Sequence, residues 1–180
     1  MKQHFNLSLT ALFCATIIGF AACNDDEKDM TKPVITDTGI VANPINCQVY
    51  HPGEVIPFCY IFEDDTELGA YNIEVHSNFD HHSHSTEADD HDHDECEEGH
   101  EDHEFDHEAT EGTQPWVYNQ DFTIPAGQHI YLAKVNIPVP AQATPGLYHF
   151  MIRLTDKAGW QQLKAIAIQI EEQERTPAQP

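Results

Sequence analysis

The stretch of sequence that decides the fold reads PGLYHFMIRLTDKAG and covers residues 145–159. Within it, Tyr148, Phe150, Ile152 and Leu154 occupy every second position, and His149 lies in the intervening set. A period of two places alternate side chains on opposite faces of a β-strand. The stretch therefore predicts a strand over residues 146–155 with one face in a hydrophobic core, followed by a turn at residues 156–159.

Similar short runs, separated by turn residues, recur along the rest of the chain, and no helical periodicity is sustained. The predicted strands cover residues 34–41, 47–50, 54–62, 68–76, 116–124, 128–139, 146–155 and 160–170. In the fourth of these, Tyr71, Ile73 and Val75 share one face and His76 lies on the other. About seven short strands with this alternation predict an all-β fold, an antiparallel sandwich of two sheets.

The N-terminus has the features of an export signal over residues 1–22: Lys2, an apolar run and small residues that end at Cys23. The apolar run is shorter than a transmembrane helix requires. These residues resemble a bacterial lipobox, which implies cleavage before Cys23 and acylation of its thiol. The alternative is an ordinary secretory signal in which Cys23 is incidental.

Residues 24–29, NDDEKD, resemble the acidic tag of Bacteroidota lipoproteins that are exported to the cell surface. The resemblance implies a lipid-anchored outer-membrane protein facing the cell surface, and a simple polar tether is the alternative. The expected organisation is a signal over residues 1–22, a tether over 23–32, a sandwich over 33–170 and a polar tail over 171–180.

Residues 80–111 form a segment with eight histidines, fifteen acidic residues and no lysine or arginine. This composition offers too little apolar surface for a packed core, so we expect a disordered insertion in the sandwich. The formal net charge of −23 argues against nucleic acid and anionic membrane surfaces as partners, because like charges repel. We therefore expect contact with a membrane only through a lipid anchor. Imidazole and carboxylate groups are ligands for divalent transition metals. A solvated acidic loop is the alternative interpretation.

Two short motifs resemble parts of immunoglobulin-like domains. Residues 145–148 resemble the tyrosine corner that opens strand F, and residues 155–159 resemble the turn between strands F and G. Over residues 33–170 the chain resembles an uncharacterised family of Ig-like lipoprotein domains from Bacteroidota. The matching segments are residues 33–35, 53–54, 64, 68–71, 74–84 and 146–150. The resemblance implies an Ig-like sandwich with a histidine-bearing loop after strand C, and it brings no established activity.

In an Ig-like fold, strands C and F are antiparallel neighbours. His76 ends the predicted strand C and His149 lies near the start of strand F, so both are expected on the outer face at one rim of the sheet. The histidine run at residues 81–84 follows from the same rim. We therefore predict a zinc site, with copper or nickel as alternatives, among His76, His81, His82, His84 and His149. Ordinary surface histidines are the alternative.

Five further histidines in the insertion provide a secondary set: His91, His93, His100, His103 and His107. The first two lie on one side of an extended backbone, and the other three share one face of a helix. This spacing does not define one ligand set, so we expect several weak, exchanging sites that collect or buffer metal. Because metal must displace protons from imidazole, binding should weaken as the pH falls towards about 6.

Cysteine spacing suggests one disulfide. Cys47 and Cys59 are equidistant from Gly53, and a hairpin turn at residues 51–54 would place them opposite each other. We predict a Cys47–Cys59 disulfide, with two buried free thiols as the alternative. Cys96 would then be a soft metal ligand or a free thiol.

No catalytic motif of the serine-hydrolase, zinc-protease or phosphate-loop type occurs in the sequence, so an enzyme is not expected. The predicted function is capture of divalent metal ions, with transfer to an outer-membrane uptake receptor or simple buffering. The alternative is an Ig-like adhesion or carbohydrate-binding module with an incidental acidic loop. Its candidate contacts are Trp116, Tyr118 and Trp160, for which core packing is the rival interpretation.

Overall fold

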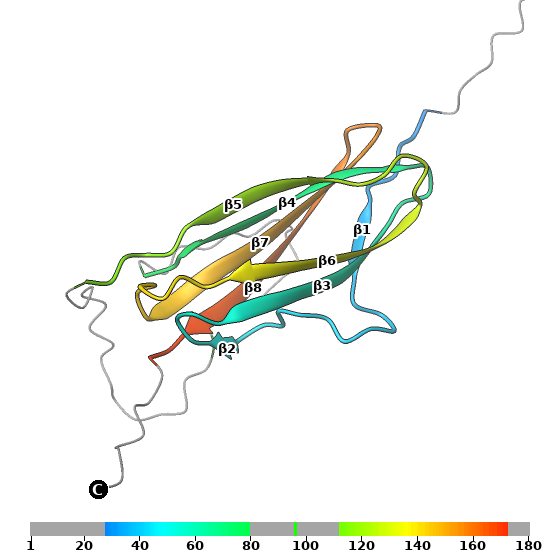
Figure 1. The fold of residues 1–180 in the computed structure, drawn as a ribbon. Coiled ribbons are helices and arrows are strands. Elements are labelled where there is room, and N and C mark those ends of the chain that lie inside the picture. Colours follow the sequence, from blue (N-terminus) through cyan, green and yellow to red (C-terminus); the bar gives the residue numbers. More distant parts are fainter. Residues whose placement is uncertain (1–27, 80–95, 97–111, 173–180) are drawn as a thin grey trace, which may run out of the picture.

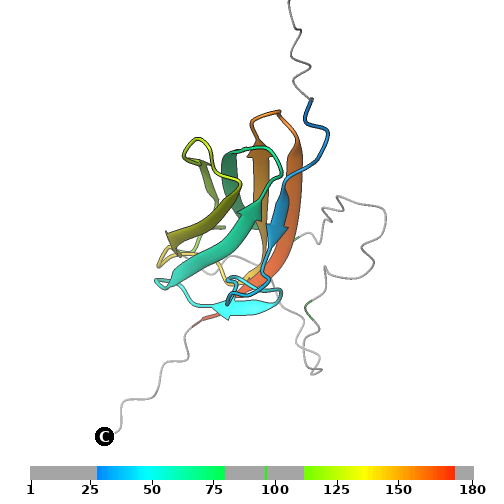
Figure 2. The ribbon, with the colours of Figure 1, turned by 90° about the vertical axis from the view of Figure 1, so that its right-hand side faces the viewer.

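The computed structural model describes residues 28–79, 96 and 112–172. These residues form eight strands in two sheets that face each other (Figures 1 and 2). The three-stranded sheet has the order β1-β3-β6, with β1 at Val34–Thr36, β3 at Val55–Glu63 and β6 at Ile130–Pro138. The five-stranded sheet has the order β2-β8-β7-β4-β5, with bounds Gln48–Tyr50, Gln161–Ile170, Gly146–Asp156, Leu68–Ser77 and Tyr118–Thr123. The predicted all-β sandwich is confirmed.

Each predicted range corresponds to a strand, and most ends differ by one or two residues. The largest difference is at β1, which was predicted to reach residue 41 and ends at Thr36. A turn follows directly, in which the Ile40 amide donates to the Asp37 carbonyl at 3.3 Å. Gly39 occupies this turn with a φ of 81°, a conformation that glycine adopts without steric cost.

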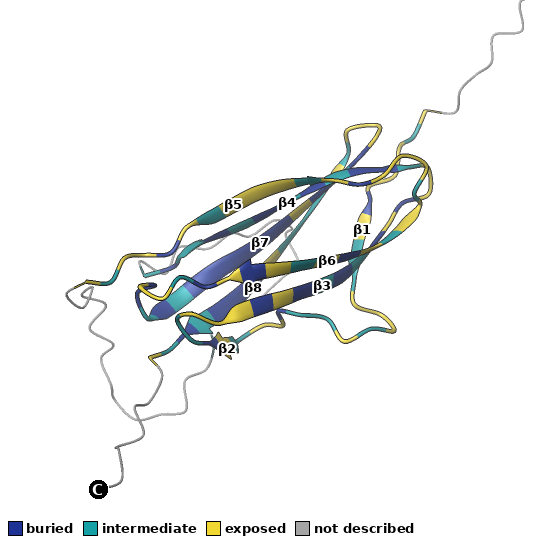
Figure 3. Ribbon diagram, viewed as in Figure 1, coloured by how far each residue is buried: buried dark blue, intermediate teal, exposed yellow. Residues whose placement is uncertain are grey.

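The core lies between the two sheets and is centred on β7, which is buried along most of its length (Figure 3). The predicted inward set of β7 is fully buried: Tyr148, Phe150, Ile152 and Leu154. The Phe150 ring stacks on that of Phe58 from β3, with ring centroids 5.9 Å apart. Burial of each such side chain stabilises the fold by about 1.5–3 kcal/mol, and this contact joins the two sheets.

Tyr148 forms the corner predicted at the start of this strand. Its hydroxyl donates to the Thr144 carbonyl at 2.7 Å and accepts from the Trp116 amide at 3.1 Å. Burial raises the pKa of Tyr148 because the charged phenolate would lose its hydration. Gly146 lies beside the corner with a φ of 142°, and a Cβ there would lie 2.6 Å from the Phe79 ring. The corner therefore requires glycine at this position.

The predicted Cys47–Cys59 disulfide is wrong, because β2 and β3 do not form a hairpin. β2 pairs in parallel with β8 of one sheet, whereas β3 pairs with β1 and β6 of the other. The backbone of Cys59 instead bridges to Asn43, and its thiol is free. Cys47 forms a disulfide with Cys96, with Cα atoms 5.2 Å apart.

Several predicted segments lie outside the described residues. They are the signal peptide over residues 1–22, the lipidation residue Cys23 with the tether up to residue 27, the insertion over residues 80–111 except Cys96, and the tail from residue 173. In the part of the chain that the structure describes, no helix has the length and apolar character needed to cross a membrane.

Candidate functional site

His76 and His149 lie directly opposite each other in the antiparallel register of β4 and β7. Their ring centroids are 5.4 Å apart, and the rings meet edge to face at 85°. Both side chains leave the strand on the face opposite to the core residues Val75 and Phe150, as the alternation requires. The predicted juxtaposition of the two histidines is confirmed, whereas metal binding by them stays a prediction.

The two histidines differ in burial. The side chain of His76 is 21% exposed, while His149 is only 2% exposed. On the same outer face, Met151 and Ala167 are also buried, and Ala167 lies opposite His149 across β7 and β8. The alternative interpretation, an ordinary surface histidine, is therefore wrong for His149, which belongs to a buried patch of the outer face.

Glu74 accompanies the pair, since it lies two positions before His76 on the same face of β4. Its Oε1 atom lies 3.2 Å from His76 Nδ1, a short electrostatic contact without the alignment of a hydrogen bond. A carboxylate beside Nδ1 favours the tautomer that leaves Nε2 available as a ligand atom. Sequence reasoning missed Glu74, although the alternation of β4 places it beside His76.

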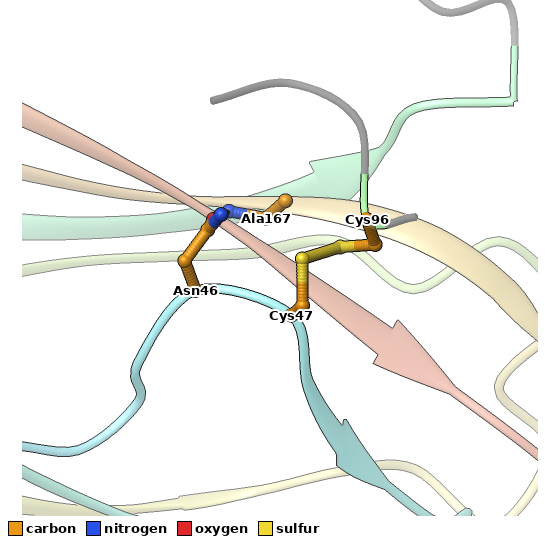
Figure 4. Close-up of a disulfide and its surroundings, with 4 residues drawn as sticks. All are labelled: Asn46, Cys47, Cys96 and Ala167. Carbon is orange, nitrogen blue, oxygen red and sulfur yellow. A yellow bond between two sulfur atoms is a disulfide. The ribbon is translucent and has the colours of Figure 1, made fainter. Parts of the chain in front are cut away.

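The Cys47–Cys96 disulfide lies next to the buried patch of His149, Met151 and Ala167, because Cys47 is hydrogen-bonded to Ala167 (Figure 4). The Cys47 amide donates to the Ala167 carbonyl at 2.8 Å, and the Asn46 side-chain oxygen accepts from the Ala167 amide at 3.0 Å. Ala167 is the residue that pairs with His149, so Cys96 is held against the strand beside the buried histidine. No local sequence signal indicates this pairing, because the cysteines are 49 positions apart.

The chain that leads into the insertion is fixed at the same end of the five-stranded sheet. The Asn78 amide donates to the Leu147 carbonyl at 2.8 Å. The Phe79 ring packs edge to face against Tyr148, with centroids 5.4 Å apart. Two described residues flank the segment 80–95. Phe79 follows β4, and Cys96 is linked through its disulfide to Cys47, which is hydrogen-bonded to β8.

The other predicted ligands lie outside the described residues. They are the rim histidines His81, His82 and His84 and the secondary histidines His91, His93, His100, His103 and His107. His76 and His149 are the two predicted primary ligands within the described residues, and the structure brings them together.

The aromatic residues of the alternative function do not share one surface. Trp116 is 4% exposed and packs against Tyr148 in the core. Tyr118 is half-buried beside it. Trp160 follows β7 at the far end of the sheet, where its indole Nε1 donates to the Asp29 carbonyl at 3.0 Å. Core packing explains Trp116, and backbone attachment explains Trp160.

In a comparison with known families, the model described as Domain of unknown function (DUF4625) matches residues 21–171. The chain belongs to this family. The match includes all eight strands and the histidine-rich segment that connects β4 to β5 in the sequence, and the expected uncharacterised domain family is confirmed. No curated protein matches the chain. A role for the domain has to come from its own residues.

Proposed function

We propose that this protein is a cell-envelope lipoprotein that captures a divalent transition metal, with zinc favoured over copper and nickel. The observation that supports this proposal is the pairing of His76 with His149 at the point where β4 leads into the histidine-rich segment. Imidazole is a ligand for zinc, copper and nickel, and the carboxylate of Glu74 lies 3.2 Å from His76 Nδ1.

The separation of the rings agrees with a shared ion. Two imidazoles bound to one tetrahedral zinc at about 2.0–2.1 Å have ring centroids roughly 5 Å apart. The centroids of His76 and His149 are 5.4 Å apart, close to that separation, and rotation of the edge-to-face rings would turn one nitrogen of each toward a shared ion. In this proposal two of the three histidines His81, His82 and His84, which follow Phe79 within five positions, complete the tetrahedral coordination. The secondary histidines act as a reservoir.

The remaining parts of the proposal concern fold family and location. The strand orders β1-β3-β6 and β2-β8-β7-β4-β5 support an Ig-like sandwich, because they place the strands in the positions A-B-E and A′-G-F-C-C′. Acylation of Cys23 would anchor the chain in the outer membrane with the domain at the cell surface. A non-enzymatic role follows, in which captured metal is buffered or handed to an uptake receptor.

Isothermal titration of the purified chain with zinc near neutral pH tests the proposal. The double variant His76→Ala/His149→Ala should lose the tightest zinc equivalent, while His129→Ala, which removes an exposed histidine on another strand connection, should keep it. Equal binding by all three proteins would refute a site at this histidine pair. Titrations with copper and nickel would rank the metals.

The role of the insertion needs a separate variant. Deleting it would also remove Cys96 and the disulfide, so the secondary histidines should instead be replaced by asparagine with Cys96 retained. The proposal expects fewer zinc equivalents and an unchanged tightest site. A module that binds carbohydrate or a protein partner would keep that binding in both variants and would show no specific zinc uptake.

A further inference from the structure

Three aspartates converge at the end of the sandwich opposite to the histidine pair. Asp29 precedes β1 in the N-terminal segment, Asp64 follows β3, and Asp156 is the last residue of β7. They come from the incoming chain, the three-stranded sheet and the five-stranded sheet, respectively. One ligand oxygen from each lies within 4.8 Å of the other two. In Figures 1 and 2 the N-terminal segment and the β7–β8 turn lie at this same end.

One oxygen of each carboxylate is held by backbone amides of its own loop. Asp64 Oδ1 accepts from the amides of residues 66 and 67 at 2.9 and 2.7 Å. Asp156 Oδ1 accepts from the amides of Gly159 and Trp160 at 2.6 and 2.9 Å. Asp29 Oδ1 accepts from the amide of residue 31 at 2.9 Å. These bonds orient the side chains.

The second oxygen of each carboxylate is buried and has no hydrogen-bond partner. This holds for the Oδ2 atoms of Asp29, Asp64 and Asp156. Asp64 is 9% exposed and Asp156 is 4% exposed, so neither carboxylate is simply hydrated at the surface. Buried carboxylate oxygens are normally paired, and three carboxylates within 4.8 Å of one another repel. A bound cation would neutralise the repulsion between the carboxylates and serve as the missing partner of their oxygens.

The ligand atoms indicate which cation fits. All three residues offer carboxylate oxygen, with neither nitrogen nor sulfur in the group. Hard cations such as calcium prefer this set, whereas zinc and copper prefer imidazole or thiolate. Calcium accepts about six to eight oxygen ligands in a flexible arrangement, whereas magnesium requires a near-ideal octahedron and keeps several waters, so three carboxylates from separate segments favour calcium. The three ligand oxygens lie within 4.8 Å of one another, a spacing that one calcium ion can bridge.

We propose that Asp29, Asp64 and Asp156 bind one calcium ion that fastens the N-terminal segment to the ends of both sheets. Two contacts already guide that segment: the Trp160 indole to the Asp29 carbonyl at 3.0 Å, and the Thr31 hydroxyl to Asp65 at 2.8 Å. Calcium adds a link that bridges all three parts. The site would set the direction in which the domain leaves its N-terminal tether.

The calcium site is independent of the histidine pair. Asp156 lies opposite Leu68 at the start of β4, and His149 lies opposite His76 eight positions further on. At the rise of an extended strand, this separates the two sites by about 26 Å. Zinc binding at the pair should therefore be unaffected by variants at the aspartates, and the two proposals can fail separately.

Calcium titration of the purified full chain tests the proposal, with calcium chloride as the probe and binding heat and thermal unfolding as readouts. Asp29→Asn, Asp64→Asn and Asp156→Asn should each weaken the tightest calcium equivalent at least tenfold and abolish its stabilising effect. Asp37→Asn removes the same charge from an exposed position just after β1 and should leave both unchanged. Without calcium, Asp156→Asn should unfold at the same or a higher temperature than the unmodified chain, since it relieves repulsion.

Two outcomes would overturn the proposal. The first is equal calcium binding by all four variants, which would assign the ion to other carboxylates of this acidic chain. The second is loss of stability in Asp156→Asn both with and without calcium while calcium affinity is retained. If the Asp64 or Asp156 variant does not fold, Asp29→Asn decides, because its side chain lies outside the strands. Terbium luminescence excited through tryptophan gives an independent readout next to Trp160 and should be lost in Asp29→Asn.

Discussion

Replacing Cys96 with serine would cut the covalent link between the histidine-rich segment and the edge of β8. The disulfide closes a loop with a sequence separation of 49. In the chain-entropy description, closure of a loop this long stabilises the folded state by about 4 kcal/mol, and measured losses on removing native disulfides are about 2–5 kcal/mol. The hydrogen bonds from Asn46 and Cys47 to Ala167 remain in the variant. We therefore expect the free energy of unfolding to fall by about 2–4 kcal/mol.

Guanidinium denaturation of the unmodified chain, Cys96→Ser and Cys59→Ser measures this change. Cys59 is a free thiol on the outer side of β3, so its replacement should alter the free energy of unfolding by less than about 1 kcal/mol. Cys96→Ser should also increase the denaturant dependence, since the unfolded chain without the link is more expanded. Adding a reductant should lower the stability of the unmodified chain and of Cys59→Ser, and leave Cys96→Ser unchanged.

The opposite pattern would refute the reasoning. A Cys47–Cys59 disulfide closes a much shorter loop and would contribute about 3 kcal/mol, so Cys59→Ser would then be the destabilised variant and Cys96→Ser the neutral one. Peptide mapping under non-reducing conditions provides the direct control. The peptide that contains Cys47 should be recovered joined to the peptide that contains Cys96.

Two further predictions concern buried tyrosines. Tyr148→Phe removes the hydroxyl that bonds Thr144 and Trp116 and leaves a buried amide without an acceptor, so chemical denaturation should show a loss of about 2–3 kcal/mol. Tyr118→Phe, at an exposed hydroxyl bond, should lose less than about 1 kcal/mol, and equal losses would contradict the corner's role. Burial raises the pKa of Tyr71 to about 12. Its neutral form therefore contributes stability that is complete below about pH 10 and is lost as pH rises through about 12, roughly 3 kcal/mol in all. Tyrosinate absorbance and circular dichroism should change together in an alkaline titration, and early tyrosinate formation by the folded protein would contradict this.

The strands were accessible from the sequence because their signal is local. Alternation along residues 146–155 depends only on the two faces of a strand, and β7 buries the predicted side chains. The same logic placed His76 and His149 on outer faces, and the neighbouring positions of strands C and F brought them together. Glu74 follows from that alternation as well. For such features, the residue types and their period are sufficient.

Other features depend on which distant segments meet, and only the tertiary structure decided them. Symmetry about Gly53 suggested a hairpin, but Cys47 joins the five-stranded sheet and Cys59 the three-stranded one, so Cys96 became the partner. The burial of His149 likewise depends on what covers the outer face, which alternation along one strand does not contain.

The aspartate cluster shows the same limit most clearly. Asp29, Asp64 and Asp156 belong to no sequence motif and are separated by tens of residues. Each of the three residues reads locally as an ordinary turn or tether residue, and turn chemistry accounts for one oxygen of each carboxylate. The three carboxylates meet only because the N-terminal segment lies at the ends of both sheets. Sequence by itself determined the strands and their faces, since these arise from interactions between near neighbours in the chain. The tertiary structure decided the disulfide and the carboxylate cluster, because both are contacts between segments that folding alone brings together.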